Sequence, residues 1–217
     1  LFWRALKANW IPAAGIWIFG ALVVFGYYRG GIVHDAAGWV LRVRDGMGFW
    51  YPMISAALFG AVLPILTQAL LMPKMCGDGL GKLLYLAPFW FYKGFEIDIF
   101  YRLQAVIFGT SHDFATIAGK VLCDQFIYTP TFGLVEIVFF LRWMERRRGG
   151  VTPAEPFIPK GWYGGLVFPI LVGNWALWIP AVSLVYMLPT ALQLPLANLI
   201  FWFWSLMLLF MAKDASK

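Results

Sequence analysis

Residues 10–28 read WIPAAGIWIFGALVVFGYY, a run of nineteen positions without a charged side chain. Crossing about 30 Å of hydrocarbon takes about 20 apolar residues, because each helical residue advances the chain by about 1.5 Å. Five further apolar segments follow, three of them uncharged and two interrupted by charges. The six expected spans are residues 10–28, 49–73, 83–109, 121–141, 166–189 and 191–212. The sequence therefore predicts an all-α, polytopic transmembrane helical bundle with about six spans.

The composition of the chain agrees with a membrane protein. It is 61% hydrophobic and 13% charged, whereas soluble domains carry about 25% charged residues. Lipid offers no hydrogen-bond partners to the backbone, so the spans must be helices or a closed barrel. The long apolar runs lack the alternation of barrel strands, which excludes the barrel.

The division of the chain is also expected from its sequence. Residues 1–48 are predicted to form an additional span and a connecting segment, with a short interfacial helix over residues 36–45. Residues 49–217 are predicted to form the main transmembrane bundle.

The basic residues predict the orientation of the chain. With six spans, one side carries eleven of them: Arg4, Lys7, Lys74, Lys82, Arg142, Arg146, Arg147, Arg148, Lys160, Lys213 and Lys217. The other side carries four: Arg29, Arg42, Arg44 and Lys120. This bias predicts both termini on the cytoplasmic side, or on the matrix side of an organelle. It also explains the net charge of +6 without a nucleic-acid partner. The group Arg146, Arg147 and Arg148 would end the fourth span and attract anionic lipid.

The third expected span contains charges that a lipid-facing helix does not carry. Residues 91–102 read FYKGFEIDIFYR, with Lys93, Glu96, Asp98 and Arg102 near the middle of the segment. The spacings i to i+3 and i to i+4 bring opposite charges together, so Lys93–Glu96 and Asp98–Arg102 pairs are expected. The two pairs point to different sides, which predicts a position in the middle of the bundle.

Three more polar residues, Asp124, Gln125 and Glu136, lie in the fourth expected span and complete a candidate intramembrane polar network. The acids Asp124 and Glu136 add no local cation to the network, so one or both would be protonated or paired with a cation from elsewhere in the chain. Pro88 and Gly94 would kink or break the third span and free carbonyl groups for an ion. Two interpretations of this network remain open. It lines a hydrophilic path for a small solute or protons, or it is an ionic clasp that fixes helix packing.

Catalytic and cofactor motifs are not found in the sequence. Both histidines, His34 and His112, lie in connections between spans, which argues against a haem or catalytic site at membrane depth. Cys76 and Cys123 stand alone and are expected to be free thiols. The sequence thus predicts neither an enzyme nor a bound metal or cofactor.

Two blocks of sequence carry a family resemblance. KVLCDQFIYTP at 120–130, with Lys120, Asp124, Gln125 and Pro130, resembles a K-x-x-x-D-Q-x-x-x-x-P signature. NWALWIPAV at 174–182, with Trp175, Trp178 and Pro180, resembles a W-x-x-W-P block. Both belong to the family of Mpv-seventeen and the twenty-two-kilodalton peroxisomal membrane protein, and the resemblance covers about residues 50–213.

The resemblance implies an organellar multi-pass membrane protein without known catalytic chemistry, acting as a weakly selective channel for small solutes. The mitochondrial inner membrane is the expected location, with peroxisomal, plastid and bacterial inner membranes as alternatives. The chain also departs from the family pattern, because 181–188 lacks the family's amides and Gln193 replaces its arginine. These departures favour an alternative role, that of a non-catalytic accessory subunit in a larger membrane complex. The expected partners are therefore the lipid bilayer and either further copies of the chain or such a complex.

Overall fold

The computed structural model describes residues 2–73, 77–149 and 156–215, and in these ranges it contains helices and no strand. The predicted all-α class is thus confirmed. Lys74, Cys76 and Lys217, which the sequence analysis singled out, lie outside the described residues. The elements in chain order are α1 (Phe2–Arg29), α2 (Ile32–Met47), α3 (Trp50–Ala57), η1 (Leu58–Val62), α4 (Leu63–Leu71), α6 (Gly79–Phe108), α7 (Phe114–Cys123), η2 (Asp124–Gly133), α8 (Leu134–Arg147), η3 (Tyr163–Val167), α9 (Phe168–Tyr186) and α10 (Thr190–Ala215).

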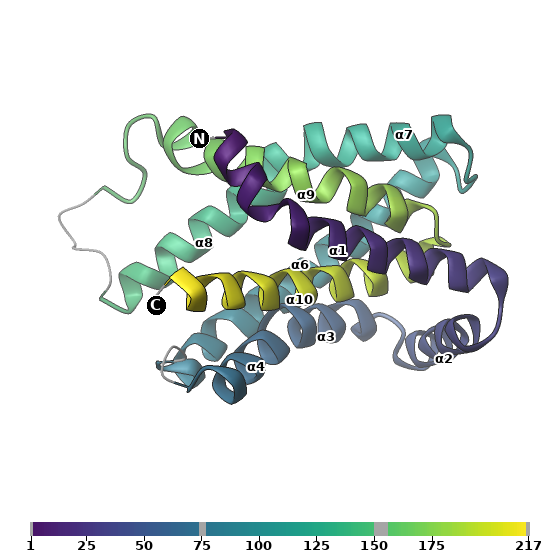
Figure 1. The fold of residues 1–217 in the computed structure, drawn as a ribbon, viewed down its shortest axis with the longest axis horizontal. Helices are drawn as coiled ribbons and strands as arrows, with labels where there is room; N and C mark the ends of the chain where they lie inside the picture. Colours follow the sequence, from purple (N-terminus) through teal and green to yellow (C-terminus); the bar gives the residue numbers. More distant parts are fainter. Residues whose placement is uncertain (1, 74–76, 150–155, 216–217) are drawn as a thin grey trace.

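The long helices form a bundle with two ends (Figure 1). Both chain termini lie at one end, together with the end of α8 and the start of α6, where Arg148 is paired with Asp78. The turns that leave α1, α6 and α9 lie at the other end. There the Tyr28 hydroxyl donates to the Met187 carbonyl oxygen at 2.5 Å and lies 3.4 Å from His112 Nε2. The start of α1 and the end of α10 thus lie at the same end of the bundle. The side of a membrane that this end faces stays a prediction.

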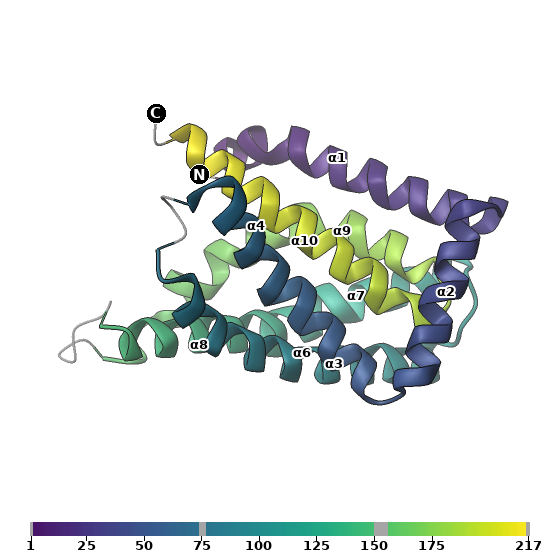
Figure 2. The same cartoon turned by 90° about the horizontal axis from the view of Figure 1, so that it is seen from below.

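Helix α2 closes the second end of the bundle. It makes an angle of 89° with α1, and Figure 2 shows it crossing from α1 toward α3. The sharp bend falls on Gly30 and Gly31, whose φ angles of +88° and +83° are adopted readily only by glycine. A helix was predicted within this connection, at residues 36–45, and α2 contains it.

The interior of the bundle is partly polar and much of its outside is apolar. Lys93, Asp98, Gln104, Asp124 and Gln125 are buried. Large apolar side chains are exposed over every long helix, including Leu22, Phe25, Leu70, Leu84, Ile99, Leu103, Val106, Ile127, Phe132 and Ile170. Buried charges with exposed apolar side chains are typical of helices that face lipid. This arrangement is compatible with an integral membrane protein.

The predicted number of spans is not supported. Among the described residues, three segments are long and apolar enough to cross a membrane: Trp50–Leu71, Phe114–Arg147 and Tyr163–Tyr186. Helices α1 and α2 add a fourth if the bent pair counts as one span. Helix α6 is 30 residues long, so its length of about 45 Å is enough to cross a membrane. Its charged residues distinguish it from the three apolar segments. The described apolar part of α10, Thr190–Leu206, is shorter than a typical span.

Helix α6 also differs from its predicted form. It is α-helical through both Pro88 and Gly94, so the expectation of a broken helix is wrong. It packs most closely on α3, where a Cβ placed on Gly94 would lie 2.2 Å from the Pro52 carbonyl oxygen. Its opposite face carries exposed Tyr92, Ile99 and Leu103. The two ion pairs therefore lie at the borders between the buried face and the exposed face of α6. Helix α6 is thus not surrounded by other helices on all sides.

The apolar core lies mainly between α1, α9 and α10. Its buried side chains are Ala13, Ile16, Val24, Leu177, Ala181, Val182, Val185, Leu196 and Ile200, among others. Trp17 Nε1 donates to the Leu177 carbonyl oxygen at 2.9 Å, which joins α1 to α9. Burying each large apolar side chain contributes about 1.5–3 kcal/mol relative to water. The first helix is thus packed into the bundle. The division into residues 1–48, as an additional span with a connecting segment, and residues 49–217, as the main bundle, stays a prediction.

Candidate functional site

The Lys93 cluster consists of Lys93, Glu96, Tyr128 and Glu136. Lys93 Nζ lies 2.6 Å from Glu96 Oε2 and 3.2 Å from Glu136 Oε2. The Tyr128 hydroxyl donates to Glu96 Oε1 at 2.6 Å and accepts from Lys93 Nζ at 3.3 Å. The predicted i to i+3 pair is therefore present. Glu136, which has no cation close by in the sequence, is paired with a cation from another helix, because α8 returns beside α6 and brings Glu136 Oε2 to the Lys93 ammonium group.

The Asp98 cluster consists of Arg44, Asp98 and Arg102. Asp98 Oδ2 accepts from Arg102 Nε at 2.7 Å, one helical turn away as predicted. Asp98 Oδ1 accepts from Arg44 Nη2 of helix α2 at 2.5 Å. Arg44 Nη1 also donates to the Ala191 carbonyl oxygen at 3.1 Å. Arg44 is buried and Arg102 is exposed, so the carboxylate is held mainly by an arginine that sequence spacing did not identify.

The Asp124 cluster consists of Asp124, Gln125, Thr129 and Tyr186. Asp124 Oδ1 accepts from Gln125 Nε2 at 3.0 Å and from the Thr129 hydroxyl at 3.2 Å. Asp124 Oδ2 accepts from the Tyr186 hydroxyl at 2.5 Å. Within the described residues no lysine or arginine forms an ion pair with this carboxylate. Its prediction as an acid without a local cation agrees with this geometry.

The π-helical conformation of η2 positions the Asp124 cluster. η2 runs over ten residues, Asp124–Gly133, and contains Pro130. Proline has no N–H group and disturbs the regular hydrogen bonding of an α-helix. π-Helical turns are rare and occur frequently at functional sites. Here the wider turn directs Asp124, Gln125 and Thr129 into the interior, where all three are buried.

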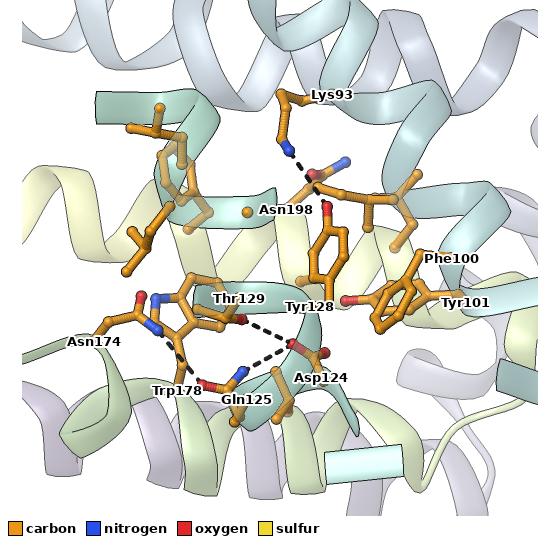
Figure 3. A pocket seen from close by; sticks show the side chains of 18 of the residues that line it. Lys93, Phe100, Tyr101, Asp124, Gln125, Tyr128, Thr129, Asn174, Trp178 and Asn198 are labelled. Atoms are coloured by element: carbon orange, nitrogen blue, oxygen red, sulfur yellow. Dashed lines mark hydrogen bonds between the residues drawn. The ribbon is translucent and has the colours of Figure 1, made fainter. Parts of the chain in front are cut away.

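A partly open cavity of about 150 Å³ lies between α6, η2, α8, α9 and α10. Its polar lining comes from Lys93, Asp124, Gln125, Thr129, Asn174 and Asn198, and its aromatic lining from Trp90, Phe100, Tyr101, Tyr128, Trp178 and Phe201. Figure 3 shows Lys93 and Asp124 on different sides of the cavity, with Tyr128 between them. The Phe100 and Tyr128 rings stack with their centroids 4.1 Å apart. The cavity thus contacts both the Lys93 cluster and the Asp124 cluster.

The two blocks behind the family resemblance meet at this cavity. Trp175 Nε1 donates to the Gln125 carbonyl oxygen at 2.7 Å, and Asn174 Nδ2 lies 3.5 Å from Gln125 Oε1. Trp178 lines the cavity, and Pro180 lies inside α9 on the turn that follows. The Pro130 carbonyl oxygen accepts from the Tyr163 hydroxyl at 3.0 Å. The segments 120–130 and 174–182, which lie about fifty residues apart in the chain, therefore pack together beside the cavity through polar and aromatic side chains.

Lys120 occupies a different place from the one predicted. It was counted among the cations at one surface of the membrane, but it is buried in α7. Its Nζ lies 5.9 Å from the centroid of the Tyr186 ring, a distance at which a cation is attracted by an aromatic face. Its backbone carbonyl oxygen accepts from Gln104 Nε2 at 3.2 Å. Lys120 therefore belongs to the packing behind the Asp124 cluster.

The remaining titratable groups do not assemble into a metal site. In the described ranges no three His, Cys, Asp or Glu side chains are placed to hold a metal ion. Cys123 is half-buried and unpaired. His34 stacks on Tyr27, with ring centroids 5.1 Å apart, and His112 contacts Tyr28 at the closed end of the bundle. Neither histidine approaches the cavity lining.

No known protein family, curated protein or solved structure matches this chain. The resemblance to the Mpv-seventeen family therefore rests on the residues quoted above and stays a prediction.

Proposed function

We propose that this protein is a multi-pass membrane protein that lets a small polar solute pass, with the partly open cavity as the place where the solute binds. The observation that carries the proposal is a cavity at the centre of an apolar bundle that is lined by Lys93, Asp124 and three amide side chains. Charged and amide side chains at such depth are costly and commonly mark solute or ion paths. No catalytic chemistry is part of the proposal.

The proposal also includes a location and contacts with lipid. We propose the mitochondrial inner membrane, on the family resemblance alone. The exposed cations Arg147 and Arg148 at the end of α8, together with Arg146, would contact anionic lipid at the membrane surface. The exposed apolar side chains would contact acyl chains.

The test is the flux of small solutes into proteoliposomes that contain the purified protein. Flux of molecules with only a few heavy atoms is expected, since 150 Å³ corresponds to about five water molecules at about 30 Å³ each. Lys93→Met and Asp124→Asn are expected to change its rate or selectivity. Glu145→Gln is the control, because it removes a carboxylate that is exposed on α8. The proposal fails if the wild type conducts no solute, or if neither cavity variant differs from the control.

A second candidate function is that of an accessory subunit in a larger membrane assembly. It is favoured by the internal pairing of the charges, since Lys93 lies between two carboxylates and Asp98 between two arginines. Charges that neutralise one another act as a clasp between helices, which a structural subunit requires. Migration with a large complex on native gels after mild extraction supports this role, and migration as a lone or self-associated chain contradicts it.

A further inference from the structure

Asp124 is a buried carboxylate that forms no ion pair with a lysine or arginine of the described ranges. Its three partners, Gln125, Thr129 and Tyr186, all donate hydrogen bonds to it, which suits the ionised form because that form only accepts. Neutral donors offset part of the cost of burying a carboxylate, and an opposite charge offsets more. A positively charged ligand would supply the opposite charge that Asp124 lacks.

The other charged groups near the cavity do not reverse this balance. Lys93 lines the cavity, but Glu96 and Glu136 both contact its ammonium group. Both carboxylate partners of Lys93 are therefore on its own side of the cavity, and Asp124 is not one of them. Lys120 lies against the Tyr186 ring and forms no ion pair with Asp124 in the part of the chain that the structure describes. Of the two charged groups that line the cavity, Lys93 is thus already paired with carboxylates, whereas Asp124 forms no ion pair among the described residues.

The rest of the lining consists largely of aromatic side chains. They are Trp90, Phe100, Tyr101, Tyr128, Trp178 and Phe201. Aromatic rings attract cations, most strongly where water is excluded, and cages of such rings recognise alkylammonium groups. The volume of about 150 Å³ equals that of an engineered protein cavity that takes up benzene. A solute of about five or six heavy atoms therefore fits.

We propose that the cavity binds small organic cations of the alkylammonium type, with Asp124 as the counter-ion and the aromatic side chains as the cage. The inference rests on the proposed function, because it names the class of solute that the protein would pass. An anion is disfavoured by Asp124, and a neutral solute of the same size leaves the charge of Asp124 unbalanced.

The experiment compares three probes of five or six heavy atoms that differ in charge, namely tetramethylammonium (a cation), tert-butanol (neutral) and isobutyrate (an anion). Binding to the purified protein in detergent is followed by tryptophan fluorescence, since Trp90 and Trp178 line the cavity, and by calorimetry against empty micelles. Tetramethylammonium is expected to bind at least about tenfold more tightly than either of the other probes. Equal affinity for the three probes, or no binding of any, overturns the inference.

Two variants identify the counter-ion. Asp124→Asn keeps the shape of the side chain and is expected to weaken tetramethylammonium binding by at least about tenfold. Glu145→Gln, at an exposed position of α8, is expected to leave binding unchanged. Unchanged affinity in a folded Asp124→Asn protein overturns the role of Asp124, and the probe comparison on the wild type decides the case if that variant does not fold.

The binding measurement tests the cation site, and the flux measurement tests the proposed function, so each claim can fail without the other. Selective binding of tetramethylammonium without flux in proteoliposomes supports the cation site and overturns the proposed function. Flux of all three probes at similar rates, without selective binding, supports the proposed function and overturns the cation site.

Discussion

Asp98 is shared by two arginines that differ in their exposure to the surroundings. Arg44 is buried, whereas about two thirds of the Arg102 side-chain surface is exposed (65%). An exposed ion pair contributes about 0–1 kcal/mol. Removing one partner of a buried pair costs about 3–5 kcal/mol, because the other charge is left buried and unpaired. The two arginines should therefore respond differently to the loss of Asp98.

The first prediction concerns the partner that rescues Asp98→Leu. The single variant Asp98→Leu is expected to lower the free energy of unfolding by about 3–5 kcal/mol, because it strands Arg44. The double variant Asp98→Leu with Arg44→Leu is expected to recover most of this loss. The measurement is unfolding of the purified protein in mixed micelles by increasing amounts of denaturing detergent.

The matched control for this prediction is the other arginine. Arg102→Leu alone is expected to change the free energy of unfolding by less than about 1 kcal/mol, and adding it to Asp98→Leu is expected to rescue little. Equal rescue by both arginines would show that Arg44 is not buried with Asp98 as described.

At this scale the sequence predicted local contacts and missed distant ones. The pairs Lys93–Glu96 and Asp98–Arg102 follow from helical spacing alone. The contacts Arg44–Asp98 and Glu136–Lys93 join residues 54 and 43 positions apart, and no spacing rule brings them together. The sequence of α2 predicts a helix but not the direction in which it turns away from α1. Arg44 was therefore assigned to a polar connection and not to the interior of the bundle. Lys93, Asp124 and Gln125 of the predicted polar network line the cavity, whereas the rest of the lining was beyond prediction for the same reason.

At the scale of elements, the contact between α6 and α3 depends on the absence of a side chain. A Cβ on Gly94 would lie 2.7 Å from the Ala56 Cβ and still closer to the Pro52 carbonyl oxygen. The backbone of α3 cannot move aside without displacing Pro52 and Met53, which are both buried. Gly94 therefore allows the helix with the charges to approach α3 closely.

The second prediction tests this approach. Gly94→Ala is expected to destabilise the protein by about 1–3 kcal/mol through overpacking. Gly173→Ala in α9 is the control, since a Cβ there has no neighbour within 4 Å and alanine favours a helix over glycine by about 0.5–1 kcal/mol. Thermal unfolding in detergent should give opposite shifts for the two variants. A Gly94→Ala protein as stable as the control would contradict the tight packing.

Element boundaries were predicted where a turn signal is strong. The sequence offers Ser111 and Asp113 as caps of the helix that follows, and Asp113 caps α7 by accepting from the backbone N–H of Thr116 at 3.0 Å. Hydrogen bonds with Ser111 and with both donors of Thr116 hold the pKa of Asp113 well below its usual range. The π-helical turns η1, η2 and η3 were not predicted, because an extra residue in one turn leaves the hydrophobic pattern of a long apolar run almost unchanged.

At the scale of the whole molecule, the two ends of the bundle carry different charges. The end with the termini holds two acidic side chains, Asp78 and Glu145, and six basic ones among the described side chains: Lys82, Arg142, Arg146, Arg147, Arg148 and Lys160. The other end, with α2 and the turns, holds three of each within the same described set: Arg29, Arg42, Arg44, Asp35, Asp45 and Asp113. An excess of basic residues faces the cytoplasm or the matrix. The end with Arg148 is therefore expected to lie on that side.

The third prediction places the two ends on opposite sides of a membrane. In a background with Cys76 and Cys123 replaced by serine, Ser111→Cys and Glu145→Cys each introduce one thiol at an exposed position. An impermeant maleimide added to sealed vesicles is expected to label only one of the two, and the other only after the vesicles are opened. Labelling of both from the same side would contradict the orientation of the bundle.

The sequence predicted the helical class, but its span count of six is not supported. The side of the membrane on which the termini lie stays a prediction. The class follows from composition and from the needs of the backbone in lipid, which do not depend on tertiary structure. The count depends on hydropathy along each helix, and α6 shows why this is insufficient. Its charges at Lys93 and Asp98 are buried against other helices, a compensation that the sequence of α6 alone does not reveal.

The π-helical stretch η2 has a consequence for how this protein can evolve. Each residue of a helix turns the chain by about 100°, so a deletion between Asp124 and Gly133 would rotate all of α8 about its axis. Glu136 would then leave Lys93, and the two carboxylates would no longer share one ammonium group. A substitution at an outward position such as Ile127, which is 61% exposed, changes none of this. Insertions and deletions in η2 are therefore expected to be purged by selection, while the identities of its outward residues drift.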